Sequence, residues 1–352
     1  MTNAEANDDL PKIAIVPLAN YSNSLKAHDL VTNLLRENLS EMGYDLVDND
    51  SLRAGMRATR LRLVGEIDSA GSDQIAEQTG AEILMTGSLD IYLEQVNPEV
   101  SVSFRAYDCS THRVIWAGCI STTGEDQAGL FGVGRLTNIQ ELTAKVVKTL
   151  IAKMPELSEQ GRKPKHKPTK NDLKLMQEGR IAIVRFDNST DVPNADAVVT
   201  NAMIEEAWRR GYDVVEPGEL SRIRARLAAD FQGGTSDSAL AILRDEYGVA
   251  IVVTGTVTRF LPNRGVSIEA VPEIEFTIRS INPNSGEVMS SLSIERDGSA
   301  RETIFGAGRV SAIGEVARQA LRDSWDELIA GWFAKTPAAL QTDTDGDQNA
   351  KR

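Results

Sequence analysis

One stretch of this sequence occurs twice, and the repetition limits what the chain can fold into. The tetrapeptide at Ile13–Val16 recurs at Ile181–Val184, an offset of 168 in the numbering. At the same offset, residues 13–90 align with residues 181–258 without a gap and with 20 identities in 78 positions. Self-similarity at a fixed spacing is the signature of a repeated structural unit. We therefore expect one α/β domain to occur twice in tandem.

The repeat continues at a changed spacing to the end of each unit. Phe-Gly-Val-Gly-Arg at 131–135 matches Phe-Gly-Ala-Gly-Arg at 305–309, where the offset has become 174. The six extra residues fall between Thr256 and Phe276, and surface loops tolerate such insertions. The predicted organisation is a flexible N-terminus, a first domain, a basic linker, a second domain and a disordered tail, with the bounds 1–11, 12–154, 155–179, 180–333 and 334–352.

Hydrophobic patterns predict the same elements in each unit. Apolar runs rich in Ile and Val open the units and are typical of central strands. An apolar stripe at helical spacing follows, and Gly43 and Gly211 stand where a left-handed residue would end that helix. Further strands are expected at 44–47, at 82–89 and in a hairpin, before a closing helix with Thr137 or Ser311 as N-cap. The expected fold is a mixed α/β sheet in the order β-α-β-α-α-β-β-β-α, twice.

Composition restricts the partners and the compartment. The net charge is −13, so the chain is a poor electrostatic match for nucleic acid. No apolar run approaches the ~20 residues that span a bilayer. The N-terminus is polar and acidic and does not resemble a signal peptide, which leaves a cytoplasmic protein and one that has lost a leader as alternatives. Cys109 and Cys119 are too far apart in the expected hairpin to form a disulfide.

Three segments resemble a known family of bacterial envelope proteins. They are the opening strand that ends at Asn20, the strand at 80–88, and the hairpin around Arg105–Trp116. Together they are similar to the CsgG curli secretion proteins, to the amino-terminal domain of TolB and to the LpoB-type periplasmic activators. The resemblance implies a periplasmic or envelope protein that acts by contact with other envelope proteins, with no cofactor. The chain lacks the lipidated cysteine and the long insertions of the channel-forming members, which argues against a pore.

The glycine-rich motif that occurs in both units is the most distinctive candidate site. It precedes a helix, where backbone N–H groups can bind an anion and the arginine can assist. The alternative is a turn shaped by glycine, with the phenylalanine anchored in the core. The spacing fits neither a P-loop nor a dinucleotide fingerprint. The candidate ligand or interface residues of this motif are Phe131, Gly132, Gly134, Arg135, Phe305, Gly306, Gly308 and Arg309.

Asn20 and Asn188 are the second pair of candidates. Each lies where the first strand turns toward its helix, a common ligand position in open α/β sheets. Asparagine is also a routine turn residue, so a purely structural role is the alternative. His28, His112 and His166 have no spacing typical of metal ligands. No catalytic constellation is recognised in the sequence.

The sequence thus favours a non-enzymatic envelope protein that acts by protein–protein contact, as an adaptor or as an assembly or secretion accessory factor. Two alternatives stay open. One is a nucleotide or small-anion binding protein that uses the glycine-rich motifs. The other is a ring-forming secretion-assembly subunit without a membrane barrel, built from head-to-tail contacts.

Overall fold

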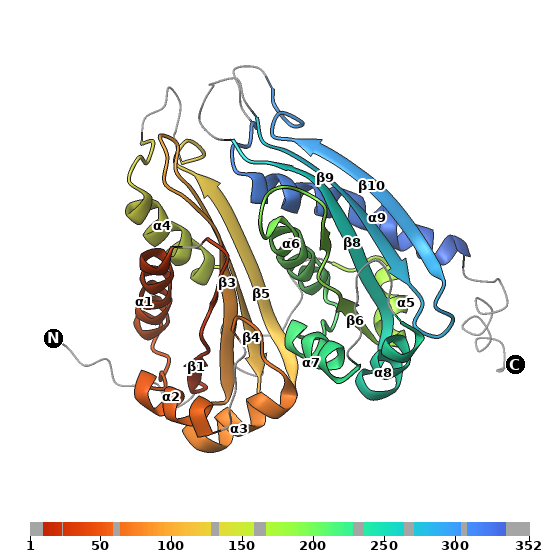
Figure 1. The fold of residues 1–352 in the computed structure, drawn as a ribbon, viewed down its shortest axis with the longest axis horizontal. Coiled ribbons are helices and arrows are strands. Elements are labelled where there is room, and N and C mark those ends of the chain that lie inside the picture. Colours follow the sequence, from red (N-terminus) through yellow and green to blue (C-terminus); the bar gives the residue numbers. More distant parts are fainter. Residues whose placement is uncertain are drawn as a thin grey trace, which may run out of the picture.

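Two mixed β-sheets with similar strand order form the frame of the protein (Figure 1). The structure is a computed structural model, and it describes residues 10–22, 24–58, 64–127, 134–157, 167–227, 236–263, 271–303 and 308–335. Nine helices lie within these ranges. The predicted mixed α/β class is confirmed, and the two sheets are compatible with a two-domain arrangement. The domain boundaries remain a prediction, and the two halves are called the first and second repeat below.

The first sheet has the order β1-β3-β4-β5, with the short β2 also paired to β3. β1 and β2 run parallel to β3, whereas β3, β4 and β5 are antiparallel to one another. The strands are β1 (Ile13–Ile15), β2 (Ala19–Asn20), β3 (Ile83–Leu93), β4 (Glu99–Asp108) and β5 (Arg113–Thr123). The helices of this repeat are α1 (Leu25–Glu41), α2 (Asn49–Ala58), α3 (Ser69–Thr79) and α4 (Ile139–Ile151).

The second sheet has the equivalent order β6-β8-β9-β10, with the short β7 paired to β8. Its strands are β6 (Arg180–Ile183), β7 (Asp187–Asn188), β8 (Val249–Leu261), β9 (Glu273–Ile281) and β10 (Val288–Asp297). Its helices are α6 (Ala195–Arg210), α7 (Pro217–Leu227), α8 (Asp237–Tyr247) and α9 (Ile313–Lys335). A further helix, α5 (Lys170–Glu178), precedes β6 and begins with a capping box between Thr169 and Asp172.

The layers of the molecule alternate between helices and sheets. In Figure 1, α1 and α4 lie at the left, the first sheet follows, α6 comes next, and α9 runs behind the strands β8, β9 and β10 at the right. α6 and α9 contact their own sheet on one side and β5 of the first sheet on the other. The helices of the second repeat therefore cover a face of both sheets.

The helix ends agree with the glycine pattern, but two predicted strands are absent from the described residues. Gly43 and Gly211 both adopt the left-handed conformation, with φ of +89° and +96°. The segments at 44–47 and 212–215 form only one isolated bridge each, from Leu46 to Ile13 and from Val214 to Ile181. The prediction of strands there was wrong, because each segment pairs with the sheet at a single position and forms no continuous ladder.

Equivalent strands of the two sheets differ in burial. All ten residues of β4 are buried. In β9, Ile274, Phe276 and Ile278 are buried, whereas the residues between them are only half-buried. Alternation of this kind is typical of a sheet that packs on one face only. The first sheet is thus covered on both faces, and the second sheet leaves the equivalent face open.

Candidate functional site

The contact between the repeats buries a polar face of the first sheet. On β4, Glu99, Ser101, Ser103 and Arg105 alternate with apolar residues and are all buried. A buried polar group is costly unless it is hydrogen-bonded. Glu99 and Arg105 bond residues of both repeats, including Ile313 and Glu216 of the second, so polar residues specify the contact.

Arg105 and Glu216 form the central ion pair of this contact. Arg105 donates from Nε and Nη2 to the two carboxylate oxygens of Glu216, at 2.9 Å each, and also donates to the carbonyl oxygen of Gly65. The two residues are 4% and 0% exposed. Glu216 lies immediately before α7, at the point where that helix meets the first repeat. The bidentate geometry fixes both the distance and the orientation of the two side chains. Removal of one partner would leave the other charge buried and unpaired.

Asp90 accepts hydrogen bonds from both repeats. Ser88 and Ser103 donate to it from the first sheet, and Asn201 of α6 donates to it at 2.9 Å. Burial raises the pKa of Asp90 to about 6, although these hydrogen bonds oppose the shift. The carboxylate therefore links the first sheet to α6 in an environment that disfavours its charge.

The N-terminus of α9 is capped by carboxylates of the first repeat. The backbone N–H of Ile313 donates to Glu99 and that of Ser311 donates to Asp126, both at 2.9 Å. Burial, with a smaller contribution from Asp126, raises the pKa of Glu99 to about 8. In the first repeat, α4 is capped by Asn138, which accepts from Gln140 and Glu141. The expectation that Thr137 caps α4 was wrong by one residue, and Ser311 takes part through its backbone N–H.

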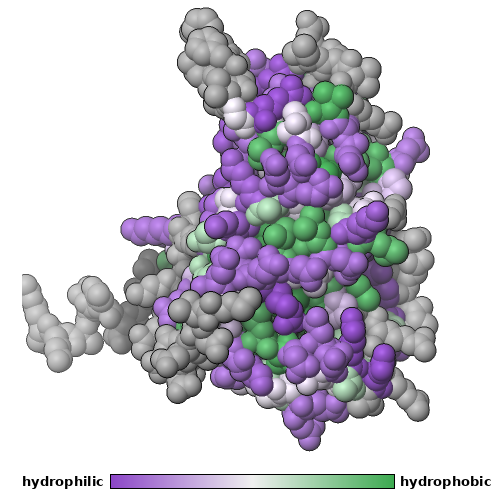
Figure 2. Space-filling view, turned by 90° about the vertical axis from the view of Figure 1, so that its left-hand side faces the viewer, coloured by the Kyte–Doolittle hydropathy of each residue, from purple (hydrophilic) through white to green (hydrophobic). Residues whose placement is uncertain are grey.

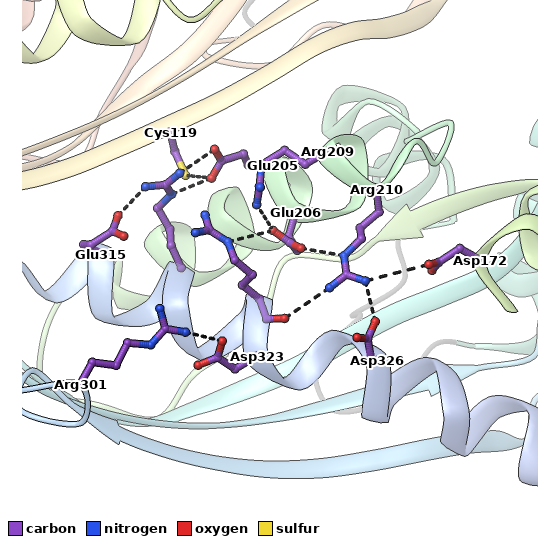
Figure 3. A network of polar contacts seen from close by, with 12 residues as sticks. Cys119, Asp172, Glu205, Glu206, Arg209, Arg210, Arg301, Glu315, Asp323 and Asp326 are labelled. Atoms are coloured by element: carbon purple, nitrogen blue, oxygen red, sulfur yellow. Dashed lines mark hydrogen bonds and ion pairs between the residues drawn. The ribbon is translucent and has the colours of Figure 1, made fainter. Parts of the chain in front are cut away.

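A network of charged side chains joins α6 to α9 and reaches the first sheet (Figure 3). Arg318 of α9 holds Glu205 of α6 in a bidentate pair at 2.6 and 2.7 Å, and the Cys119 thiol of β5 donates to the same carboxylate. Burial raises the pKa of Glu205, but Arg318 more than offsets this and leaves that pKa lowered. The charge on Glu205 is thereby kept, which suits a contact between surfaces rather than proton transfer.

Arg210 extends the same network toward the linker. It bonds Glu206 at 2.9 Å and Asp326 at 2.5 Å, and it lies 4.0 Å from Asp172 of α5. Asp172 in turn accepts from Tyr212 and Trp325. These bonds fix α5, α6 and α9 as one body against which the first sheet packs.

A cavity of about 320 Å³ lies beside the central ion pair, between the repeats. Its wall includes Tyr21, Glu66, Arg105, Arg185 and Asn201. Arg185 pairs with Asp196 and lies over the ring of Tyr21, 5.2 Å from its centre. The charged groups that surround the cavity are thus largely paired with one another.

The equivalent polar face of the second sheet is not covered by a helix in the described ranges. This surface, called the open face below, consists of Thr254, Thr256, Arg259, Glu273, Glu275, Thr277, Arg279, Ser291, Ser293 and Glu295, which are paired across β8, β9 and β10. Arg279 occupies the place of Arg105 at the offset of 174, yet it has no hydrogen bond or ion pair among the described residues. The hydroxyl of Thr277, at the place of Ser103, is buried without a partner in the part of the chain that the structure describes.

The two candidate asparagines shape turns. Asn20 accepts from the backbone and hydroxyl of Ser22 and donates to the carbonyl of Ser24. Asn188 makes the same pattern with Thr190 and Val192. The neighbours of Asn20 on either side line the cavity. Whether either asparagine also contacts a ligand stays a prediction.

The glycine-rich motifs are described only in part. Phe131, Gly132, Phe305 and Gly306 lie outside the described residues. Gly134 and Gly308 have φ of +84° and +89°, a conformation that favours glycine. Arg135 is exposed and donates to the carbonyl of Val96 at 3.4 Å. Arg309 also takes part in a contact within the protein. The described part of the motif is thus a turn, and anion binding there remains a prediction.

The residues that form the contact were not predicted from the sequence. Glu99 and Arg105 recur as Glu273 and Arg279 at the offset of 174. Two charged residues retained on the same face of equivalent strands, opposite the apolar residues, are a signal that could have identified the polar face. The partners could not be found in this way, because Asn201 and Glu216 each lie 111 positions along the chain from the side chain they contact.

In the described ranges, no three His, Cys, Asp or Glu side chains are arranged to hold a metal ion. No helix that the structure describes is long and apolar enough to cross a membrane. Cys109 and Cys119 are free and buried, and burial raises the pKa of each thiol.

Known proteins resemble parts of this chain in structure. No protein family matches the sequence, and no curated protein matches it. Similar solved structures include the PelC dodecamer from Paraburkholderia phytofirmans, with 17% identity over 43% of this chain and 92% of that chain, at a TM-score of 0.28. The LpoB C-terminal domain from Salmonella enterica is 17% identical over 32% of this chain and 82% of its own, at a TM-score of 0.28. Lipoprotein GNA1162 from Neisseria meningitidis is 18% identical over 41% of this chain and 97% of its own, at 0.31.

LpoB, which the sequence resembles, is therefore among the similar structures, and the likeness to CsgG and TolB stays a prediction. Identities of 17% and 18%, with TM-scores between 0.28 and 0.31, establish no family.

Proposed function

We propose that this chain is a non-enzymatic cell-envelope protein that acts by protein–protein contact, as an adaptor or assembly accessory factor, and that the open face is its contact surface. The observation that carries the proposal is the difference between Arg105 and Arg279. The first is buried and bidentate on Glu216. The second has the same place on an equivalent strand and no partner among the described residues.

The chemistry of the open face supports binding to a folded partner. It is a three-stranded surface of Ser, Thr, Glu and Arg side chains, with Arg259 placed 2.9 to 3.9 Å from Glu295, Glu275 and Glu273. In the first repeat the corresponding surface is buried largely by α6 and α9, and Glu216, immediately before α7, pairs with Arg105. A face that binds helices in one repeat is preorganised to bind a similar surface in the other. The envelope location rests on the resemblance noted in the sequence.

Site-specific cross-linking tests this proposal. A photoreactive residue at Ser293, exposed on β10, should give discrete adducts in bacterial envelope fractions. The same substitution at Ser238, exposed on α8, is the matched control and should give none. Absence of adducts from Ser293, or substrate turnover by the pure protein, would overturn the proposal.

A further inference from the structure

Resting on the proposed function, we infer that the partner of the open face is a second copy of this chain. In this head-to-tail contact, the exposed surface of α1 and of the start of α2 docks on the open face of another molecule. This surface of the first repeat is called the α1 side. The contact between the two repeats of one chain is the basis for this inference. In that contact, helices of the second repeat pack on the first sheet. In the same way, helices of the first repeat of another molecule can pack on the second sheet.

The first repeat has an acidic residue at the position equivalent to Glu216. Glu216, the partner of Arg105, lies immediately before α7. The equivalent residue at the offset of 168 is Asp48, which lies immediately before α2. Asp48 is exposed, and it accepts the backbone N–H groups of Asp50 and Ser51 through one oxygen, Oδ1. In the head-to-tail contact, Arg279 of one copy pairs with Asp48 of the next.

Two further contact residues are identical in both repeats. Asn201, which donates to Ser88 and Asp90 on the first sheet, corresponds to Asn33 on α1. Glu205, which accepts from Cys119, corresponds to Glu37. Asn33 and Glu37 are exposed, whereas Asn201 is half-buried and Glu205 is buried. The same residue types thus lie one helical turn apart on α1, on the side opposite its buried stripe.

Other positions show that the contact between copies is weaker than the contact within one. Gly314 of α9 lies so close to the first sheet that an added Cβ would be 2.6 Å from Cβ of Ser121. The counterparts of these two residues are Gln140 and Glu295. Their longer side chains prevent α4 from approaching the open face as α9 approaches the first sheet. The contact is therefore centred on α1 and the start of α2.

The surface of the α1 side fits a reversible contact. Figure 2 shows it as mostly hydrophilic, with separate hydrophobic patches rather than one continuous apolar area. Polar interfaces of limited area are typical of transient association. Because the two surfaces differ, the contact is heterologous, and its repetition gives open chains or closed rings.

Mass measurement on purified full-length protein tests the inference. By sedimentation velocity, the average mass should rise above the 38.3 kDa of one chain as concentration increases. Arg279→Glu and Asp48→Ser should each weaken association by about tenfold or more, since a charge pair across an interface is lost. Serine retains an oxygen that caps α2, and Glu287→Arg in the exposed β9–β10 turn is the control that should change nothing.

Mixing the two variants gives the decisive result. Arg279→Glu keeps an intact Asp48, and Asp48→Ser keeps an intact Arg279, so one normal contact can form between them. The mixture should associate and stop at twice the mass of one chain. Wild-type protein that stays monomeric at all concentrations would overturn self-association. Adducts of Ser293 with a different protein would then leave the proposed function standing, whereas absence of any adduct would remove both.

Discussion

The two repeats present the same sheet face to opposite environments. In the first, Glu99 and Arg105 lie under the helices of the second repeat, where each has a hydrogen-bonded partner. In the second, Glu273 and Arg279 lie at the same register on a half-exposed strand. Because the residue types at these two positions are identical, the difference in their role arises from what packs on each face. The first repeat uses this face in its contact with the second, whereas the second repeat leaves it uncovered by a helix in the described ranges.

The largest expected effect is a difference in the free energy of unfolding between variants of Arg105 and of Arg279. Arg105→Met should lower the free energy of unfolding by about 3–5 kcal/mol, because Glu216 would be left buried without its partner. Arg279→Met should change it by about 0.5 kcal/mol or less, as is usual for surface positions. Urea denaturation of both variants measures the difference. The double variant Arg105→Met with Glu216→Leu should recover most of the loss, and equal effects of the two single variants would contradict the comparison.

A smaller effect concerns the pH dependence of stability. Glu99 has a pKa of about 8 in the folded protein, well above the value near 4.5 of an unfolded glutamate, so the folded state binds the proton more tightly. Its contribution to stability is fully present below pH 4.5 and is lost as pH rises through 8. Between pH 5 and pH 8 the loss should be on the order of 3 kcal/mol.

Glu99→Gln should flatten this part of the profile, because glutamine still accepts the N–H of Ile313 but does not titrate. Glu273→Gln is the matched control in the half-exposed strand. Urea denaturation at several pH values between 5 and 8 measures both variants. If Glu99→Gln retains the full wild-type slope, another group controls the pH dependence. Asp90, with a pKa of about 6, is the first alternative.

The smallest expected effect distinguishes the two closing helices. Asn138→Ala removes the side chain that caps α4 and should cost about 1 kcal/mol of stability. Ser311→Ala should cost about 0.5 kcal/mol or less, since Ser311 contributes its backbone N–H to Asp126. Thermal unfolding of both variants provides the measurement, and a larger loss for Ser311→Ala would show that its hydroxyl caps α9.

The mixed sheet, the hairpins and the helix stripes could be predicted from the sequence because they depend on local periodicity. Gly43 and Gly211 marked helix ends through a backbone conformation that glycine favours. The short strands β2 and β7 were not predicted, since two residues carry no pattern. The pairing of Arg105 with Glu216 could not be predicted either, because it depends on how two distant segments pack.

The caps of α9 bear on the order in which the chain acquires its structure. Glu99 and Asp126 lie far upstream of α9 in the sequence, and they accept the N–H groups of Ile313, its first residue, and of Ser311 just before it. During synthesis on the ribosome, the amino-terminal part of a chain folds first. The first repeat can therefore form a surface on which the final helix is completed as it emerges. A second repeat expressed alone would begin its last helix with these N–H groups exposed to water.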